Sequence, residues 1–202
     1  MANPTPGRPR FYAGVACLDF ANTVEPRVTQ PEFDFLPDFA ALIHWSDEAK
    51  LLTPVQRRRL SRQAEENPAA AHRAYDAAIT FRESLYRLFA AVAAAKSPRG
   101  LDLQALQHVY VDAQQHATAT LVDGRLEWTW REPSLAYPAW RIAGDAIELL
   151  RSDRLQRVKR CQPTCGWLFL DTTKNNSRRW CSMRECGFEA KVQRQRESTR
   201  VK

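Results

Sequence analysis

Two close pairs of cysteines in the last quarter of the chain have a spacing typical of metal ligands. Three residues separate Cys161 from Cys165, four separate Cys181 from Cys186, and fifteen lie between the two pairs. A chain with this spacing can fold back and direct four sulfurs at one tetrahedral ion. Because no histidine follows His116, thiolates alone must hold that ion. Four thiolates favour zinc, with iron as the alternative, and leave no open coordination position, so the predicted site is structural.

Two disulfide bonds would use the same four cysteines. Disulfides are rare in the reducing cytosol, and the N-terminus lacks the apolar segment of a secretory signal. We therefore expect one structural zinc ion in a cytoplasmic protein. The fifth cysteine, Cys17, lies in an apolar stretch and is expected in the hydrophobic core.

Basic charge is concentrated in the part of the chain that carries the cysteine pairs. Residues 151–202 contain 14 Lys and Arg against 5 Asp and Glu, whereas residues 1–150 contain 16 against 18. Some of these cations offset a four-thiolate zinc site, and the surplus favours a polyanion, first of all nucleic acid. The candidates for contacts with phosphates or base edges are Lys174, Asn175, Asn176, Ser177, Arg178, Arg179, Lys191, Arg194 and Arg196.

Residues 165–196 resemble the CGNR-type zinc finger, found at the C-terminus of a bacterial family proposed to regulate transcription. The matching positions are Leu168–Asp171, Asn176–Cys181, Met183, Cys186–Gly187 and Ala190–Lys191. A weaker similarity relates Leu18–Thr23 to the start of the ABATE domain, the family's N-terminal part, which is described as a stress-induced regulator module.

One position departs from the family pattern. The motif that names the family reads Cys-Gly-Asn-Arg, whereas Cys186-Gly187 is followed here by Phe188 and Glu189. The metal ligand is kept, but an acid replaces the family's arginine, which calls into question any nucleic-acid contact made through that position.

The first 152 residues are predicted to be mostly helical. Capping residues, prolines at helix starts and apolar periodicity predict a short helix that begins at Asp38 and further helices over about 54–66, 68–95, 103–116 and 138–151. Alternation around Asp123-Gly124 predicts a β-hairpin over 118–130. Trp128 and Trp130 fall on one face of that hairpin and are expected to be core or cover, with stacking on a ligand as the alternative.

Polar residues inside apolar stretches are the candidates for a ligand pocket in this helical part. Asp19 and Asn22 either tie a turn or line a pocket, since buried polar groups need partners. Arg82 interrupts the apolar middle of the longest helix beside Glu83. A salt bridge is the expected explanation, and Arg82 is the third candidate for binding a ligand.

The finger is predicted to be treble-clef-like. Trp167–Leu170 should form a strand, Lys174–Ser177 a turn and Arg178–Trp180 the return strand, followed by a helix that begins at Ser182 or nearer Gly187. The predicted fold class is therefore mainly α with a small β-hairpin in the N-terminal domain (α+β), with a C-terminal zinc finger. The expected domains are residues 1–152 and 153–202.

Enzyme and membrane functions are not expected. The chain has no phosphate-binding glycine loop, no Gly-x-Ser-x-Gly and no His-Glu-x-x-His, and its four histidines are scattered. The longest apolar run, Leu88–Ala95, is too short to span a membrane. The resemblance implies a transcription regulator whose finger binds DNA and whose N-terminal domain senses a small molecule. The alternatives are a zinc-stabilised protein-interaction module and an RNA binder, and a homodimer stays open.

Overall fold

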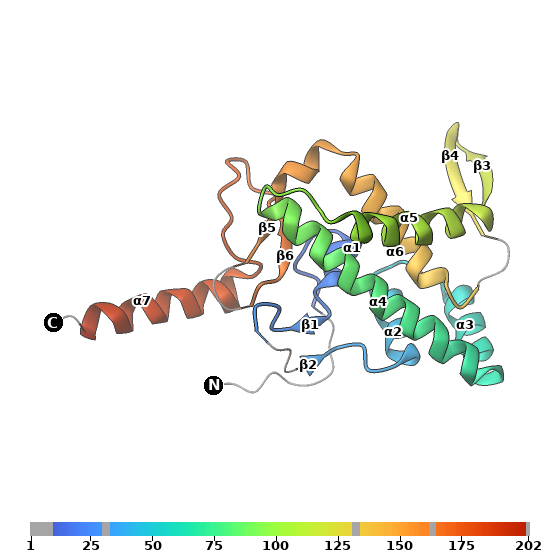
Figure 1. Cartoon of the computed structure of the whole chain (residues 1–202), viewed down its shortest axis with the longest axis horizontal. Helices are drawn as coiled ribbons and strands as arrows, with labels where there is room; N and C mark the ends of the chain where they lie inside the picture. The colour runs from blue at the N-terminus through green and yellow to red at the C-terminus, as the bar shows by residue number, and fades with distance from the viewer. Residues whose placement is uncertain (1–9, 30–32, 131–133, 162–164, 201–202) are drawn as a thin grey trace.

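A computed structural model of the chain describes residues 10–29, 33–130, 134–161 and 165–200. Within these ranges, seven α-helices, a 3₁₀ helix (Asp153–Arg157), a π-helical turn and three two-stranded antiparallel sheets follow one another (Figure 1). The helices are α1 (Ala16–Ala21), α2 (Phe39–Glu48), α3 (Pro54–Glu66), α4 (Pro68–Ala93), α5 (Gly100–Gln115), α6 (Tyr137–Leu150) and α7 (Phe188–Arg200). The strands are β1 (Val24–Glu25), β2 (Phe33–Asp34), β3 (Thr118–Val122), β4 (Arg125–Thr129), β5 (Val158–Arg160) and β6 (Leu168–Leu170). The predicted mainly α class with a small β-hairpin is confirmed.

Local capping chemistry explains where the helices begin. The Asp38 carboxylate accepts from the Ala41 N–H at 2.7 Å, and Thr53 and Gln56 form a capping box at the start of α3. The Asn67 side chain caps α4 in the same way. Helix α5 begins three residues earlier than predicted, at Gly100, because the Arg99 carbonyl already accepts from the next turn.

One hydrophobic core joins the helices to the strands that precede and follow the first cysteine pair. The long helix α4 runs along the molecule and packs against α1 and α5, and α1 packs in turn against α6 (Figure 1). Val158 from β5 and Leu168 and Leu170 from β6 belong to this core. The predicted division at residue 153 stays a prediction, and the apolar packing continues across it.

Two hairpins compare differently with their predictions. The β3–β4 hairpin forms as expected, with Asp123 and Gly124 at positive φ in its turn. The predicted return strand over Arg178–Trp180 is wrong, because β6 pairs instead with β5, which precedes Cys161 in the sequence. The Arg178 N–H donates to the Asp171 side chain instead of to a neighbouring strand.

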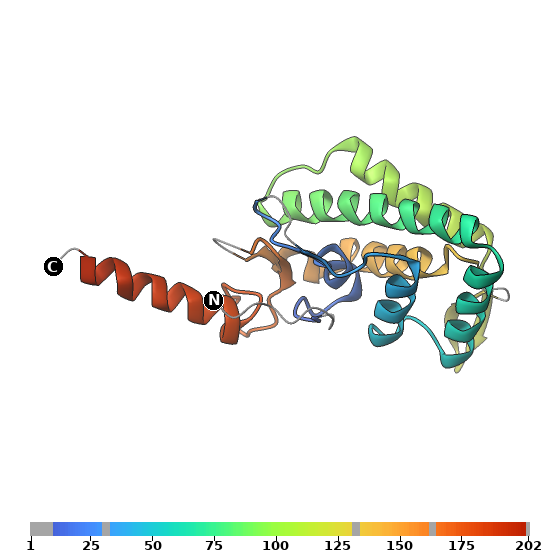
Figure 2. The same cartoon turned by 90° about the horizontal axis from the view of Figure 1, so that it is seen from below.

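Helix α7 extends away from the rest of the molecule, as Figures 1 and 2 both show. A π-helical turn, Met183–Gly187, precedes it, so the helix begins near Gly187 and not at Ser182. Phe188, the first residue of α7, is 61% exposed, because α7 projects past the helices that could cover it. No helix in the described ranges has the length and apolarity needed to cross a membrane.

Candidate metal centre and basic face

The four paired cysteines meet at one point. Their Sγ atoms all lie within 4.8 Å of one another, and that of Cys181 is 3.6 Å from those of Cys165 and Cys186. Four sulfurs held about 2.3 Å from one tetrahedral ion lie about 3.8 Å apart, so the cluster has the size of a zinc site. A disulfide would need about 2.05 Å between sulfurs, and all five cysteines are free.

The cluster is enclosed by aromatic side chains. Cys161, Cys165 and Cys181 are buried, and Trp167 and Phe169 pack against them. Tyr12, Phe35 and Trp180 cover the cluster further. A closed set of four sulfurs has no coordination position for a substrate or an activated water. The site therefore suits a structural ion.

The β5–β6 hairpin positions the first cysteine pair. Cys161 follows β5 directly, and its N–H donates to the Trp167 carbonyl at 2.8 Å. Gly166 turns the chain from Cys165 into β6 with φ +71°, and a Cβ there would lie 2.6 Å from a methyl group of Val28. Only glycine fits this turn.

The π-helical turn positions the second pair. Cys181 precedes the turn and Cys186 lies within it. Glu185, in the same turn, accepts from the Tyr12 hydroxyl at 2.9 Å and from Arg10 at 3.2 Å. Glu185 has the spacing of a capping box with Ser182, but its side chain is used by these bonds, and Ser182 makes no side-chain cap.

Electrostatics within the cluster favour a bound cation. Hydrogen bonds from the neighbouring thiols lower the pKa of Cys161, whereas the interaction with Cys161 raises the pKa of Cys165 and of Cys181. Without a cation, four thiolates so close together would repel one another. A divalent ion removes that repulsion, so the donor set fits zinc.

A buried ion pair supports the chain around the metal centre. The fully buried Asp171 carboxylate accepts from Lys159 Nζ at 2.7 Å, from the Thr173 hydroxyl at 2.6 Å and from the Arg178 N–H at 2.8 Å. Burial would raise the pKa of Asp171, but these hydrogen bonds outweigh it and lower the pKa well below its usual range.

Arg178 has a structural position in this network. Its guanidinium lies 4.7 Å from the centre of the Phe169 ring and donates to the backbone carbonyls of Tyr12, Leu170, Trp180 and Cys181. A phosphate contact would require Arg178 to leave these partners. Sequence reasoning missed the roles of Asp171 and Arg178, although both are among the positions that match the CGNR finger.

Comparison with protein-family models assigns both parts of the chain. The ABATE model, described as "Putative stress-induced transcription regulator", matches residues 14–153. The chain belongs to the ABATE family. A second model, the CGNR zinc finger, matches residues 157–198 and includes all four clustered cysteines. A search of the curated proteins found no match. The site of this ABATE protein is thus a zinc finger with four cysteine ligands and one structural zinc ion.

The other predicted nucleic-acid residues of this ABATE protein are exposed. Lys174, Asn175, Asn176, Ser177 and Arg179 lie on the loop between β6 and Cys181. Lys191, Arg194 and Arg196 lie on α7. Here "basic face" means these eight residues. Their role in nucleic-acid binding stays a prediction.

The three predicted ligand-binding residues are buried and bonded within the protein. Asn22 donates from its amide to the Leu168 carbonyl at 2.7 Å and accepts from the Leu168 N–H at 2.8 Å. Asp19 accepts from the Ala13 N–H at 2.8 Å. Arg82 makes a two-bond pair with Asp34 and contacts Glu83, as the expected salt bridge requires. A ligand role for Asp19, Asn22 and Arg82 stays a prediction.

Contacts between segments far apart in the sequence join the finger to the N-terminal helices. The indole N–H of Trp167 donates to the Val24 carbonyl at 2.9 Å. The Arg27 N–H donates to the Cys165 carbonyl at 2.8 Å, and the Tyr86 hydroxyl donates to the Gly166 carbonyl at 2.9 Å. No sequence signal pointed to these bonds, because each depends on the tertiary position of a backbone carbonyl.

Asp19 gives the fold of this ABATE protein a dependence on pH. Burial raises the pKa of Asp19 to about 7, above its value of about 3.9 in an unfolded chain. The stability contributed by the neutral carboxyl is complete below about pH 4 and decreases as the pH rises through 7. Asp19→Asn removes this titration. As the pH rises from 5.5 to 7.5, the Tm of the unaltered chain should therefore fall relative to the Tm of Asp19→Asn. Parallel Tm curves for the two proteins would contradict the role of Asp19.

Proposed function

We propose that this ABATE protein binds duplex DNA through the basic face of its zinc finger and regulates transcription in the bacterial cytoplasm. The observation that carries the proposal is the exposure of Lys191, Arg194 and Arg196 on a helix that projects from the molecule (Figure 2). A projecting helix can reach a DNA groove without a clash between the helical body and the duplex. Membership in a family described as "Putative stress-induced transcription regulator" supports the same function.

The loop part of the basic face supports contacts with the DNA backbone. The carbonyls of Asn176 and Arg178 accept from Lys159 Nζ, which holds the loop in place beside Asp171. The loop therefore presents Lys174 and Arg179 from a fixed backbone, and both side chains are exposed. Arginine and lysine in fixed positions fit phosphates and set the register of a protein on DNA.

We assign the zinc ion a structural role and the protein no enzymatic activity. The four cysteines fill a tetrahedral coordination shell, so the ion positions the loop and the start of α7 relative to each other. In this proposal, the helical part senses a small ligand and changes how well the finger binds. That half of the proposal is tested separately below.

Removing the cations of α7 should weaken DNA binding and its dependence on salt. Lys191→Ala/Arg194→Ala/Arg196→Ala should lower affinity about tenfold or more and reduce the slope of log K against log salt by about 3, because each cation releases about one counterion. The measurement is fluorescence anisotropy of a labelled duplex from the protein's own promoter, at several salt concentrations. Arg179→Ala is the matching change on the loop.

A control with equal loss of charge distinguishes this face from general basicity. Arg58→Ala/Arg59→Ala/Arg62→Ala removes three exposed arginines from α3 and should change affinity less than twofold. Equal weakening by both triple variants would contradict the proposal. An excess of unlabelled RNA hairpin separates the RNA alternative, and light scattering of the complex distinguishes a monomer from a homodimer.

A protein partner is the second candidate for the finger. Met183, in the π-helical turn, is 64% exposed, and Phe188, the first residue of α7 and next to Glu189, is 61% exposed. Exposed apolar side chains next to charged ones are typical of protein interfaces. Phe188→Ser should reduce binding to such a partner and leave DNA affinity unchanged.

A further inference from the structure

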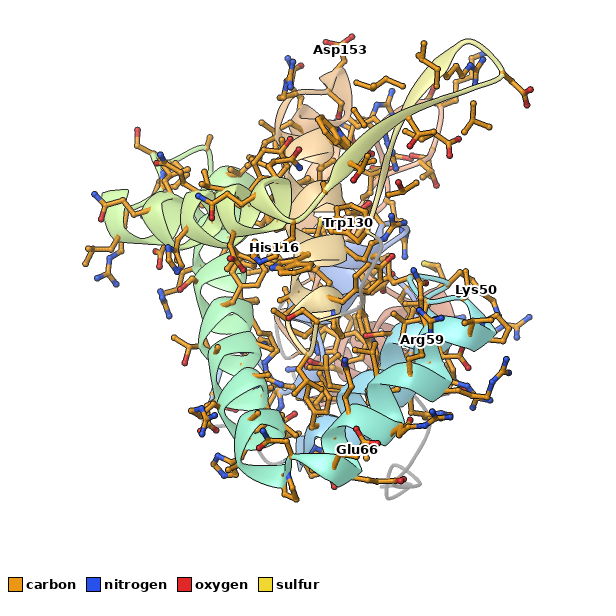
Figure 3. The ribbon with its side chains drawn as sticks, turned by 90° about the vertical axis from the view of Figure 1, so that its right-hand side faces the viewer. Lys50, Arg59, Glu66, His116, Trp130 and Asp153 are labelled. Carbon is orange, nitrogen blue, oxygen red and sulfur yellow. The ribbon has the colours of Figure 1, made fainter. Side chains whose placement is uncertain are left out.

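A cavity of about 740 Å³ lies between the β3–β4 hairpin and helix α6. Its walls come from α5, β4 and α6, with Leu51 from the turn after α2. Figure 3 looks onto this side of the molecule, where the hairpin rises beside α6 and Trp130 and His116 lie at its base. A volume of this size is within the range of cavities that hold small molecules. None of Asp19, Asn22 and Arg82 lines it.

Aromatic side chains form much of the cavity wall. Trp128, Trp130, Trp140 and Tyr110 all line it. The indole N–H of Trp140 donates to Asp112 at 2.7 Å, and that of Trp130 donates to the Ala113 carbonyl at 2.9 Å. Because its only polar group is already bonded, the partly buried Trp130 indole offers carbon surface to the cavity, whereas Trp140 is 2% exposed and stacked on His116 and supports the wall. Flat apolar surfaces of this kind fit an aromatic ring.

Trp128 differs from its predicted place as core or cover. It is 42% exposed on a hairpin whose strands are exposed along their whole length. The hairpin does not cover the helices closely, so one side of Trp128 faces the cavity instead of the core. The alternative prediction, that this tryptophan stacks on a ligand, is consistent with its position.

Arg141 supplies an unused positive charge to the cavity. Its Nε atom is buried and has no hydrogen-bond partner among the described residues, and its guanidinium lies 5.7 Å from the centre of the Trp130 ring. No hydrogen bond or ion pair within the described part of the chain engages the guanidinium, so its charge is available to an acidic ligand. Asp145 also lines the cavity, but it accepts from the Cys17 N–H at 2.6 Å.

The remaining charges belong to the rim of the cavity. Glu127, Glu148 and Arg151 are exposed to solvent. Solvent screening weakens their influence on a bound group, whereas the partly buried Arg141 acts in a medium of lower polarity. Of the two partly buried charges, the Asp145 carboxylate already has the Cys17 N–H as a donor, whereas Arg141 has no partner among the described residues, so an anionic group is expected to bind at Arg141.

We propose that this cavity binds a small planar aromatic carboxylic acid, with its ring against Trp128 and Trp130 and its carboxylate on Arg141. The planar fork of an arginine matches a carboxylate, and a charged pair of this kind is stronger than a neutral hydrogen bond. The inference deepens the ligand-sensing half of the proposed function, because it names the site and the class of ligand. It does not depend on DNA binding.

Three probes with one ring test the charge that the site prefers. We would titrate the zinc-loaded full chain with 2-naphthoate, 2-naphthamide and 2-(aminomethyl)naphthalene by calorimetry and by thermal unfolding. The carboxylate should bind at least tenfold more tightly than the other two, and at about 100 times Kd it should raise Tm by about 5 °C. Equal binding of the amide, tighter binding of the amine, or no binding of the carboxylate would each overturn the proposal.

Two pairs of variants locate the site. Arg141→Gln should weaken 2-naphthoate about tenfold, and Arg73→Gln, an exposed arginine of α4 outside the cavity, should leave its affinity unchanged. A Cβ on Gly144 meets no atom within 4 Å, so Gly144→Leu should fill the cavity and abolish binding without unfolding α6. Gly144→Ala is its control. Unchanged affinity in both Arg141→Gln and Gly144→Leu would overturn the proposal.

Readouts for the ligand and for DNA keep the two proposals separate. If 2-naphthoate binds to Arg141 but the protein binds no duplex DNA, the cavity proposal is supported and the DNA proposal fails. If duplex binding is normal and none of the three probes binds, the cavity proposal fails and the DNA proposal stands.

Discussion

Replacing Cys165 or Cys181 with serine should lower bound zinc from one ion per chain to none and unfold the finger. A structural zinc ion contributes about 10 kcal/mol or more to the folding of a finger, far more than a small aromatic cluster can replace. Both sulfurs are buried in the four-sulfur cluster, and serine is a poor ligand for zinc. Metal content by mass spectrometry and near-ultraviolet circular dichroism measure the two effects.

The loss of order should stop at β6. Leu168 and Leu170 pack in the helical core, and the Leu170 N–H donates to the Ala13 carbonyl at 2.8 Å. The Asn22 side chain bonds both the N–H and the carbonyl of Leu168. Hydrogen exchange of the zinc-free variant should therefore accelerate from residue 171 onward and remain slow in β6. Exchange that accelerates equally in α4 and β6 would show that zinc stabilises the whole chain.

Cys17→Ala is the matched control for the cysteine changes. Cys17 is fully buried in α1, outside the cluster, and burial raises the pKa of its thiol well above the usual value, so it is not a thiolate ligand. The variant should keep one zinc ion and lose about 1 kcal/mol from a small cavity. Zinc retained by Cys165→Ser and by Cys181→Ser at the level of Cys17→Ala would contradict the four-thiolate site.

Replacing Asn22 with alanine should destabilise the protein by about 2–4 kcal/mol and lower Tm by about 5–10 °C. The change leaves both the N–H and the carbonyl of Leu168 buried without a partner, and each unsatisfied group costs about 1–3 kcal/mol. Asn22 is 1% exposed, so water cannot replace the lost bonds. Thermal and urea unfolding measure the change in the free energy of unfolding.

Two further variants show whether Asn22 ties structure or binds a ligand. Asn22→Asp keeps an acceptor for the Leu168 N–H but loses the donor to its carbonyl, so it should be destabilised as well. Asn175→Ala, at an exposed position of the loop, should change stability by less than about 0.5 kcal/mol. If Asn22→Ala were as stable as Asn175→Ala, Asn22 would be free for the ligand role that the sequence suggested.

Features that depend on neighbouring residues were predictable from the amino-acid sequence. Paired cysteines, the Thr53-Pro54 helix start and the Asp123-Gly124 turn each act over a few residues, so local spacing was enough to predict them. The sequence also predicted which quarter of the chain carries the surplus of basic charge. Charge is a sum over residues and does not depend on the fold.

Features that depend on long-range pairing came from the tertiary structure. The sequence after β6 suggested a return strand, but β6 pairs with Val158–Arg160. Its Leu168 and Leu170 also bond Asn22 and the Ala13 carbonyl, and the Arg178 N–H is satisfied by a side chain. Glu185 has the spacing of a capping box, yet its carboxylate accepts a hydrogen bond from the hydroxyl of Tyr12, which lies 173 residues away in the sequence. Local patterns cannot rank such partners.

The cavity and the burial of single polar residues were also beyond the sequence. In the sequence, Arg141 is one more polar position on an amphipathic helix. Only the tertiary structure shows that its Nε is unpaired among the described residues and that it lines a cavity with Trp130, between α6 and β4. Arg178 reads as part of a basic run, but four backbone carbonyls surround it in the fold. The types and spacing of residues thus specified the metal and the charge. The burial of each side chain, which depends on segments far away in the chain, specified which residues support the fold and which remain available to bind.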